Sequence, residues 1–73
     1  MLHFDLKDQD YIELNKLLKI TGLCDSGGVA NQVITDGLVQ VDGQSELRKR
    51  RKIRAGQQVG FEGQSVIVFQ GTD

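Results

Sequence analysis

The chain has 73 residues, of which 38% are hydrophobic and 26% are charged, and its net charge is -1. This length supports one small folded core but excludes a deep catalytic cleft between two lobes, so we predict a single domain over residues 1–73. The single cysteine, Cys24, excludes an internal disulfide and suits a reducing compartment. No apolar run approaches the ~20 residues that span a membrane, and the first residues do not resemble a secretion signal. We therefore expect a cytoplasmic protein.

The first twenty residues predict a short strand followed by a helix. Apolar and polar side chains alternate from Leu2 to Leu6, which is the period of a half-buried strand. A helix is expected to start at Asp10, because Glu13 follows at the spacing of a capping box, and to end at Gly22. The predicted buried stripe of this helix consists of Tyr11, Leu14, Leu17 and Leu18.

A second helix is predicted almost immediately after the first. Asp25 or Ser26 is its expected N-cap, and Gly37 its expected end. Its predicted buried face consists of Val29, Ala30, Val33 and Ile34. Because isolated helices of ~10 residues are unstable in water, we expect the two helices to pack against each other.

The apolar period changes from helical to alternating after Gly37. Val39 and Val41 precede an Asp42-Gly43 hairpin turn, and a returning strand is expected over residues 44–47. Further strands are predicted around residues 59–61 and over residues 64–70, separated by a tight turn at residues 62–63. We therefore predict an α+β fold with a short N-terminal strand, two packed helices and a small twisted antiparallel sheet of three to four strands.

Six of the nine lysines and arginines lie within residues 48–54, with no acid between them. We call these six residues the basic run: Arg48, Lys49, Arg50, Arg51, Lys52 and Arg54. Such blocks often mark nucleic-acid contact, although a solvated mobile loop is the alternative. Patterns typical of strands lie on both sides, which favours presentation by the fold. No aromatic residue interrupts the run, so we expect folded RNA rather than a stacked single strand to be the ligand.

The sequence offers little for catalysis. His3 and Cys24 are the only residues of their types, and nothing in the pattern pairs them as base and nucleophile. Two such residues cannot make a four-ligand zinc site. We therefore expect no enzyme activity, cofactor or metal, and we interpret Cys24 as a small buried filler between the helices.

Several segments in a fixed order resemble the RNA-binding domain first described in ribosomal protein S-four. They are residues 17–23, Asp25-Ser26, Ala30, Val33-Ile34, the hairpin over residues 36–43, and the closing turn and strand over residues 55–59. The resemblance covers residues 12–61, which we take as the motif core. It implies binding to structured RNA, such as ribosomal or transfer RNA, through the second helix and the hairpin region. The chain resembles the small stand-alone bacterial members, and the family includes a small heat-shock protein that binds ribosomal subunits, so we expect a ribosome-associated protein.

The second helix departs from this family, which usually carries arginines after the serine and after the alanine. Gly27-Gly28 and Asn31 occupy those positions here, so we interpret the basic run as a relocated source of charge. A phosphate could sit on the open amides at Ser26-Gly27-Gly28, although the glycines could also be tolerated at an exposed helix start or needed for close packing. Lys19, on the outer face of the first helix, could widen the surface or be an ordinary solvated lysine. The RNA-binding candidates are therefore the basic run together with Lys19, Ser26, Gly27 and Asn31.

Two other functions remain open at this point. The basic run could dock an acidic surface of a protein partner, which would make the chain an interaction adaptor. The helix pair could bind duplex DNA, but the second helix has no lysine or arginine with which to do so. Nothing in the pattern indicates oligomerisation, so we expect a monomer.

Overall fold

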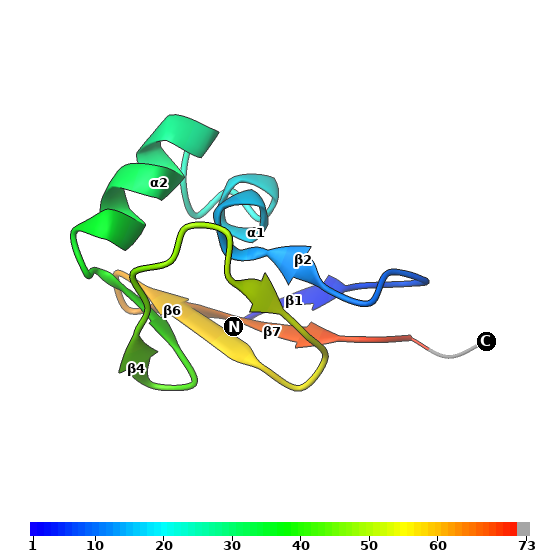
Figure 1. Ribbon diagram of the computed structural model, residues 1–73. Helices are drawn as coiled ribbons and strands as arrows, with labels where there is room; N and C mark the ends of the chain where they lie inside the picture. The colour runs from blue at the N-terminus through cyan, green and yellow to red at the C-terminus, as the bar shows by residue number, and fades with distance from the viewer. Residues whose placement is uncertain (72–73) are drawn as a thin grey trace.

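The computed structural model describes residues 1–71 and places two helices against one side of a sheet (Figure 1). The elements in chain order are β1 (Leu2–Asp5), β2 (Ile12–Glu13), α1 (Leu14–Ile20), α2 (Gly27–Thr35), β3 (Val39–Val41), β4 (Gln44–Ser45), β5 (Lys52–Ile53), β6 (Gln58–Phe61) and β7 (Gln64–Phe69). The predicted α+β class is confirmed. No helix within the described residues is both long and apolar enough to cross a membrane.

The main sheet has five strands in the order β1-β7-β6-β3-β4, and β2 and β5 form a separate antiparallel pair. Neighbours in the main sheet are antiparallel except for β1 and β7, which run parallel with Leu2 opposite Val66 and Asp5 opposite Phe69. β3, β4, β6 and β7 form the predicted antiparallel sheet of four strands. The predicted N-terminal strand, β1, extends this sheet as a fifth, parallel strand, so the sheet as a whole is mixed. The helices and hairpins between β1 and β7 supply the long connection that a parallel pair requires.

The first helix begins four residues later than predicted from Asp10. Its first two amides, from Leu14 and Asn15, donate hydrogen bonds to the carbonyl oxygens of Arg51 and Lys49 at 2.9 and 3.0 Å. Glu13 occupies the N-cap position without a side-chain capping bond, so the predicted capping box does not form. The helix start is therefore satisfied by a segment from far along the chain. Tyr11, predicted on the buried stripe, lies before β2 instead, whereas the three leucines of that stripe are fully buried.

The second helix follows the prediction closely. The hydroxyl of Ser26 accepts the amide of Val29 at 3.2 Å, which identifies Ser26 as the N-cap. At the other end, the amides of Gly37 and Leu38 donate to carbonyls of the last turn, and Gly37 has a φ of 78°. This is the paired bonding of a Schellman ending, which glycine favours because the left-handed conformation costs it little. The predicted buried face is wrong at Val29, which is 45% exposed.

The core lies between the helix pair and the inner face of the sheet. Its members are Leu6, Ile12, Leu14, Leu17, Leu18, Cys24, Ala30, Ile34, Val39, Val41, Ile53, Val59, Phe61, Val66 and Val68. Cys24 is buried, as expected of a filler, and its burial raises the pKa of the thiol. The buried valines of β3, β6 and β7 fix the register of the sheet, because a shift by one residue would expose them. The sheet thereby holds the loops at its ends in fixed positions.

Candidate nucleic-acid interface

The basic run lies on a segment that leaves the main sheet and crosses to the first helix. The predicted strand over residues 44–47 ends at Ser45, and residues 46–51 arch from β4 to β5 (Figure 1). Lys52 and Ile53 then pair with Glu13 and Ile12 of β2. The six cations therefore come from an arched loop, a short strand and the turn that follows it.

Backbone hydrogen bonds attach this segment at both of its sides. On the sheet side, the amide of Glu46 donates to the carbonyl of Val39 at 2.9 Å. On the helix side, the carbonyls of Lys49 and Arg51 accept the first amides of α1. Within the loop, the amide of Arg51 donates to the carbonyl of Arg48 at 3.2 Å. These bonds argue against the alternative of a mobile solvated loop.

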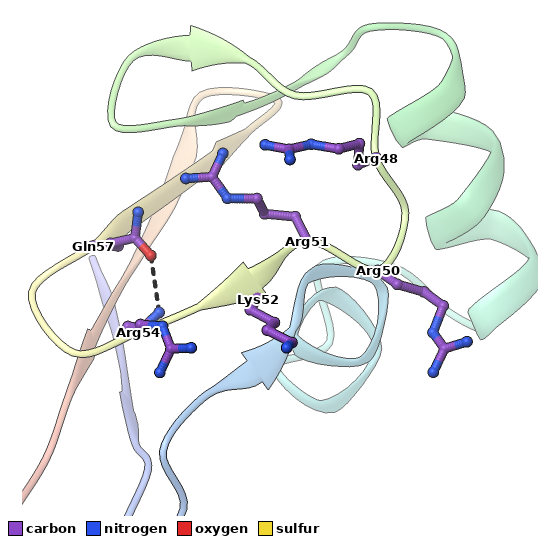
Figure 2. A pocket seen from close by; sticks show the side chains of 6 residues that line it. All are labelled: Arg48, Arg50, Arg51, Lys52, Arg54 and Gln57. Atoms are coloured by element: carbon purple, nitrogen blue, oxygen red, sulfur yellow. Dashed lines mark hydrogen bonds between the residues drawn. The ribbon is translucent and has the colours of Figure 1, made fainter.

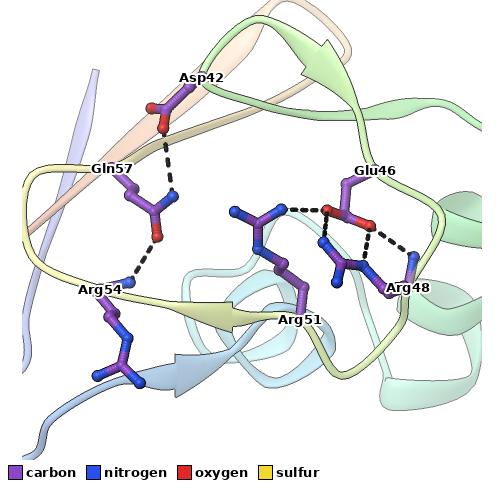
Figure 3. Close-up of polar contacts among 6 residues, drawn as sticks. All are labelled: Asp42, Glu46, Arg48, Arg51, Arg54 and Gln57. Atoms are coloured by element: carbon purple, nitrogen blue, oxygen red, sulfur yellow. Dashed lines mark hydrogen bonds and ion pairs between the residues drawn. The ribbon is translucent and has the colours of Figure 1, made fainter.

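Glu46 is the one charged residue that is buried among residues 1–71, with 8% of its surface exposed. One carboxylate oxygen accepts the backbone amide and Nε of Arg48, both at 3.0 Å, and the other accepts Nη2 of Arg48 at 3.1 Å and Nη1 of Arg51 (Figure 3). The side-chain and backbone hydrogen bonds from Arg48 lower the pKa of Glu46 to about 2. The same pair raises the pKa of Arg48. Glu46 is therefore ionised at neutral pH and holds two arginines at once.

Five cations of the basic run and one glutamine surround an open concavity of about 650 Å³. The lining residues are Arg48, Arg50, Arg51, Lys52, Arg54 and Gln57 (Figure 2). The side chains of Arg48 and Arg50 remain 71% and 78% exposed, so their donors are accessible to a ligand. Lys49 is exposed but does not line the concavity. The structure thus brings together five of the six cations predicted from the sequence.

Gln57 braces the turn that carries Arg54. Its side-chain oxygen accepts the amide of Arg54 at 2.9 Å, and its side-chain nitrogen donates to Asp42 at 3.3 Å (Figure 3). Asp42 also accepts the amide of Gln58 at 3.0 Å. The turn is therefore connected to the β3–β4 hairpin, and Arg54 starts from a fixed backbone position.

An aromatic ring lies against the basic run, although none was expected from the sequence. Nζ of Lys52 and Cζ of Arg54 lie 5.1 and 5.5 Å from the centroid of the Tyr11 ring, within the range of cation–π attraction. Arg50, which precedes them in the chain, donates to the carboxylate of Glu13 at 3.0 Å. Residues before α1 therefore contact three of the six cations. Only the pairing of β2 with β5 brings them together, and no local pattern indicates it.

The candidates on the helices are separate from this concavity. Lys19 and Gly27 line a smaller hollow together with Glu13, Asn15 and Lys16. A Cβ atom added at Gly27 would meet nothing within 4 Å, so close packing does not require glycine there.

Two further helix candidates already have structural partners. The Ser26 hydroxyl is engaged as the α2 cap, and the side-chain oxygen of Asn31 accepts from Asn15 at 3.0 Å. Within residues 1–71, no three acidic, histidine or cysteine side chains gather closely enough to hold a metal ion.

Fold and surface together define a small domain with a helix pair, a mixed sheet and a cationic loop. The chain belongs to the S4 domain family, which it matches over residues 4–69. The family resemblance predicted from the sequence is therefore confirmed.

Relatives of known sequence and structure agree with this membership. The chain is 48% identical over 68 residues to the "Putative RNA-binding protein YbcJ" of Escherichia coli K12, an alignment that covers 93% of this chain and 97% of the relative. The same identity and coverage relate it to the uncharacterized protein YbcJ of Shigella flexneri. The solution structure of E. coli YbcJ, described as revealing an ALFAL motif involved in RNA binding, matches with a TM-score of 0.73 and covers 94% of this chain and 87% of the other.

Proposed function

We propose that this chain is a non-enzymatic RNA-binding protein that recognises structured RNA mainly through phosphate contacts. The observation that carries the proposal is the concavity lined by five cations of the basic run. Membership of the S4 domain family and 48% identity to a protein named as RNA-binding support it. We expect ribosomal or transfer RNA as the target class, and a ribosome-associated monomer in the cytoplasm as the working form.

The arrangement of the cations suits phosphate groups. Arginine presents a planar fork that binds phosphate oxygens in pairs, and a fixed backbone reduces the entropy lost when RNA binds. Arg48 and Arg51 are held by Glu46, whereas Lys49, Lys52 and Arg54 make no ion pair within residues 1–71. The surface therefore combines positioned arginines with cations that have no competing acid. Backbone contacts of this kind recognise the shape of folded RNA.

We further propose that the RNA surface extends from the basic run across α1 to the start of α2. Arg50 lines both the main concavity and a neighbouring hollow that reaches Lys16. Lys16 also borders the hollow that contains Lys19 and Gly27. We assign Lys19 and Gly27 as outer contacts of this surface. Ser26 and Asn31 have a smaller part in the proposal, because their side chains already have protein partners.

The test is competition between three nucleic acids for the purified chain across a salt series. We would measure fluorescence anisotropy of a labelled RNA hairpin and compete it with unlabelled single-stranded RNA and duplex DNA. We expect preference for the hairpin, and a log-log salt slope of about 4 to 5 if all six cations meet phosphates.

Absence of hairpin binding at low salt, or binding of the single-stranded RNA and the duplex DNA as tight as that of the hairpin, would contradict the proposal. In that case the adaptor function would be tested instead, using the basic run as bait for acidic proteins.

A further inference from the structure

An acidic side chain lies within the cationic surface, which needs a physical explanation. A carboxylate beside a phosphate site repels the ligand, and leaving the position apolar or neutral would raise the positive charge of the surface. Glu46 nevertheless accepts four hydrogen bonds from two arginines of the basic run. The loop also joins the sheet at Glu46, whose backbone amide donates a hydrogen bond to the carbonyl of buried Val39.

Glu46 differs in this from the other acid that contacts the basic run. The side chain of Glu13 binds one arginine, Arg50, whose side chain is 78% exposed, and within residues 1–71 this carboxylate accepts no backbone amide of the run. Glu46 fixes the backbone of Arg48 as well as its guanidinium, and it adds Arg51 through its second oxygen. The geometry of two neighbouring arginines therefore depends on this one carboxylate.

We propose that Glu46 is a specificity-determining residue, which fixes Arg48 and Arg51 as a rigid pair that favours folded RNA over flexible single strands. The inference rests on the proposed RNA-binding function. Folded RNA presents phosphates at fixed spacings, so a fixed pair of guanidinium groups can match them without losing further freedom on binding. A single strand adapts to almost any arrangement of cations and gains little from their rigidity. The carboxylate thus lowers overall affinity and raises discrimination.

The experiment compares three variants with the wild-type chain. E46Q removes the carboxylate charge and one of the acceptors that the arginines share. R48K keeps the charge but replaces the fork with a point charge; because Arg48 is 71% exposed and Glu46 keeps Arg51, we expect this variant to fold. E62Q is the matched control, because Glu62 lies in an exposed turn of the β6–β7 hairpin and the charge change equals that of E46Q. Folding of each variant is checked by circular dichroism.

The measured quantity is the ratio of dissociation constants for a single strand and a hairpin of equal length. We expect E46Q to bind the single strand more tightly and to lower the ratio by about fivefold, which corresponds to ~1 kcal/mol. R48K should lower the ratio as well, with single-strand affinity unchanged. If E46Q does not fold, the result for R48K tests the role of Glu46 by itself. E62Q should leave the ratio at its wild-type value.

A wild-type ratio in E46Q or R48K would overturn the role of Glu46 while leaving RNA binding intact. An equal fall of the ratio in E62Q would also overturn it, because the effect would then be one of net charge alone. Failure of the wild-type chain to bind either RNA would instead overturn the proposed function itself.

Discussion

The basic run and the start of α2 are the two regions where the sequence predicts RNA contact, and they differ in how many of their polar side chains are free to contact a ligand. In the basic run, polar bonds hold the backbone and the arginines while leaving most cationic donors exposed. At the start of α2, the side chain of Ser26 caps the helix and the side chain of Asn31 accepts a hydrogen bond from Asn15. One region has its side chains available for a ligand, and the other uses them for folding.

This difference indicates that the source of charge can move within the fold without changing the scaffold. Family resemblance predicts arginines on the second helix, where this chain has glycines and an asparagine. The loop that we propose as their replacement is attached directly to the first amides of α1, so it lies beside the helix pair. We therefore expect RNA affinity to depend on the loop and stability to depend on the helix start.

The largest effect is expected from removing cations of the basic run that have no acid partner. The variant K49Q/K52Q/R54Q should lower affinity for a folded RNA by roughly 10- to 100-fold at low salt and reduce the salt slope by about 2 to 3, at ~0.7 to 0.9 per phosphate contact. The control K7Q/K16Q/K19Q has the same composition change except for one arginine and the same net charge. We expect its slope to fall by about 1 or less. Equal losses in both variants would mean that total charge, rather than its position, governs binding.

A smaller gain is expected from restoring a cation to the second helix. A Cβ atom at position 27 has open space around it, and we expect G27R to raise RNA affinity about fivefold through one added phosphate contact. Arginine has a higher helix propensity than glycine, which should offset the unfavourable placement of a cation at a helix N-terminus. Stability should therefore change little. G27Q is the neutral control, and titration of labelled hairpin RNA provides the comparison. No gain over G27Q would place the start of α2 outside the RNA surface.

Removing the cap of α2 should affect stability and leave binding almost unchanged. S26A loses the acceptor for the Val29 amide, which should lower the free energy of unfolding by about 1 kcal/mol. Urea denaturation followed by circular dichroism measures this change. RNA affinity should stay within about twofold of the wild type, since other contacts supply nearly all of it. A large loss of affinity in a folded S26A chain would identify the hydroxyl as a direct RNA contact.

The last expected effect is a pH dependence of stability that arises at Glu46, the carboxylate that holds Arg48 and Arg51. The folded-state pKa of Glu46 is about 2, below the ordinary value of 4.5, so its ionised form stabilises the fold. This contribution is complete above about pH 5 and is lost as the pH falls through 4.5 towards 2. Between pH 6 and 2.5, the free energy of unfolding should therefore fall more steeply for the wild type than for E46Q. Parallel curves would show that Glu46 does not stabilise the fold by its charge.

Features decided within a few residues were predictable from the sequence. The Ser26 cap, the glycine ending of α2 and the Asp42-Gly43 hairpin depend on local backbone preferences, and all three are present. Features decided by distant contacts were not. The start of α1 depends on carbonyls more than thirty residues away, and the parallel pairing of β1 depends on a strand at the other end of the chain.

The same distinction separates what could be predicted of the candidate site. The cluster of cations is visible in the sequence, because lysines and arginines can be counted along the chain. The contacts that position these cations depend on register, which brings Tyr11 to Lys52 and Arg54 across the β2–β5 pair. Glu46 had a weak local signal, an acid two residues before the first arginine, but its burial follows from where β4 ends. The number and sequence position of the cations were therefore predictable, but the contacts that fix their arrangement in space were not.

The most direct measurement is a map of backbone amide chemical shifts during titration of the labelled wild-type chain with a folded RNA hairpin. We predict the largest changes over residues 48–54, with weaker changes at residues 10–13, where the chain contacts the basic run, and small changes over residues 26–31. Largest changes over residues 26–31, with residues 48–54 unaffected, would contradict the assignment of RNA binding to the basic run.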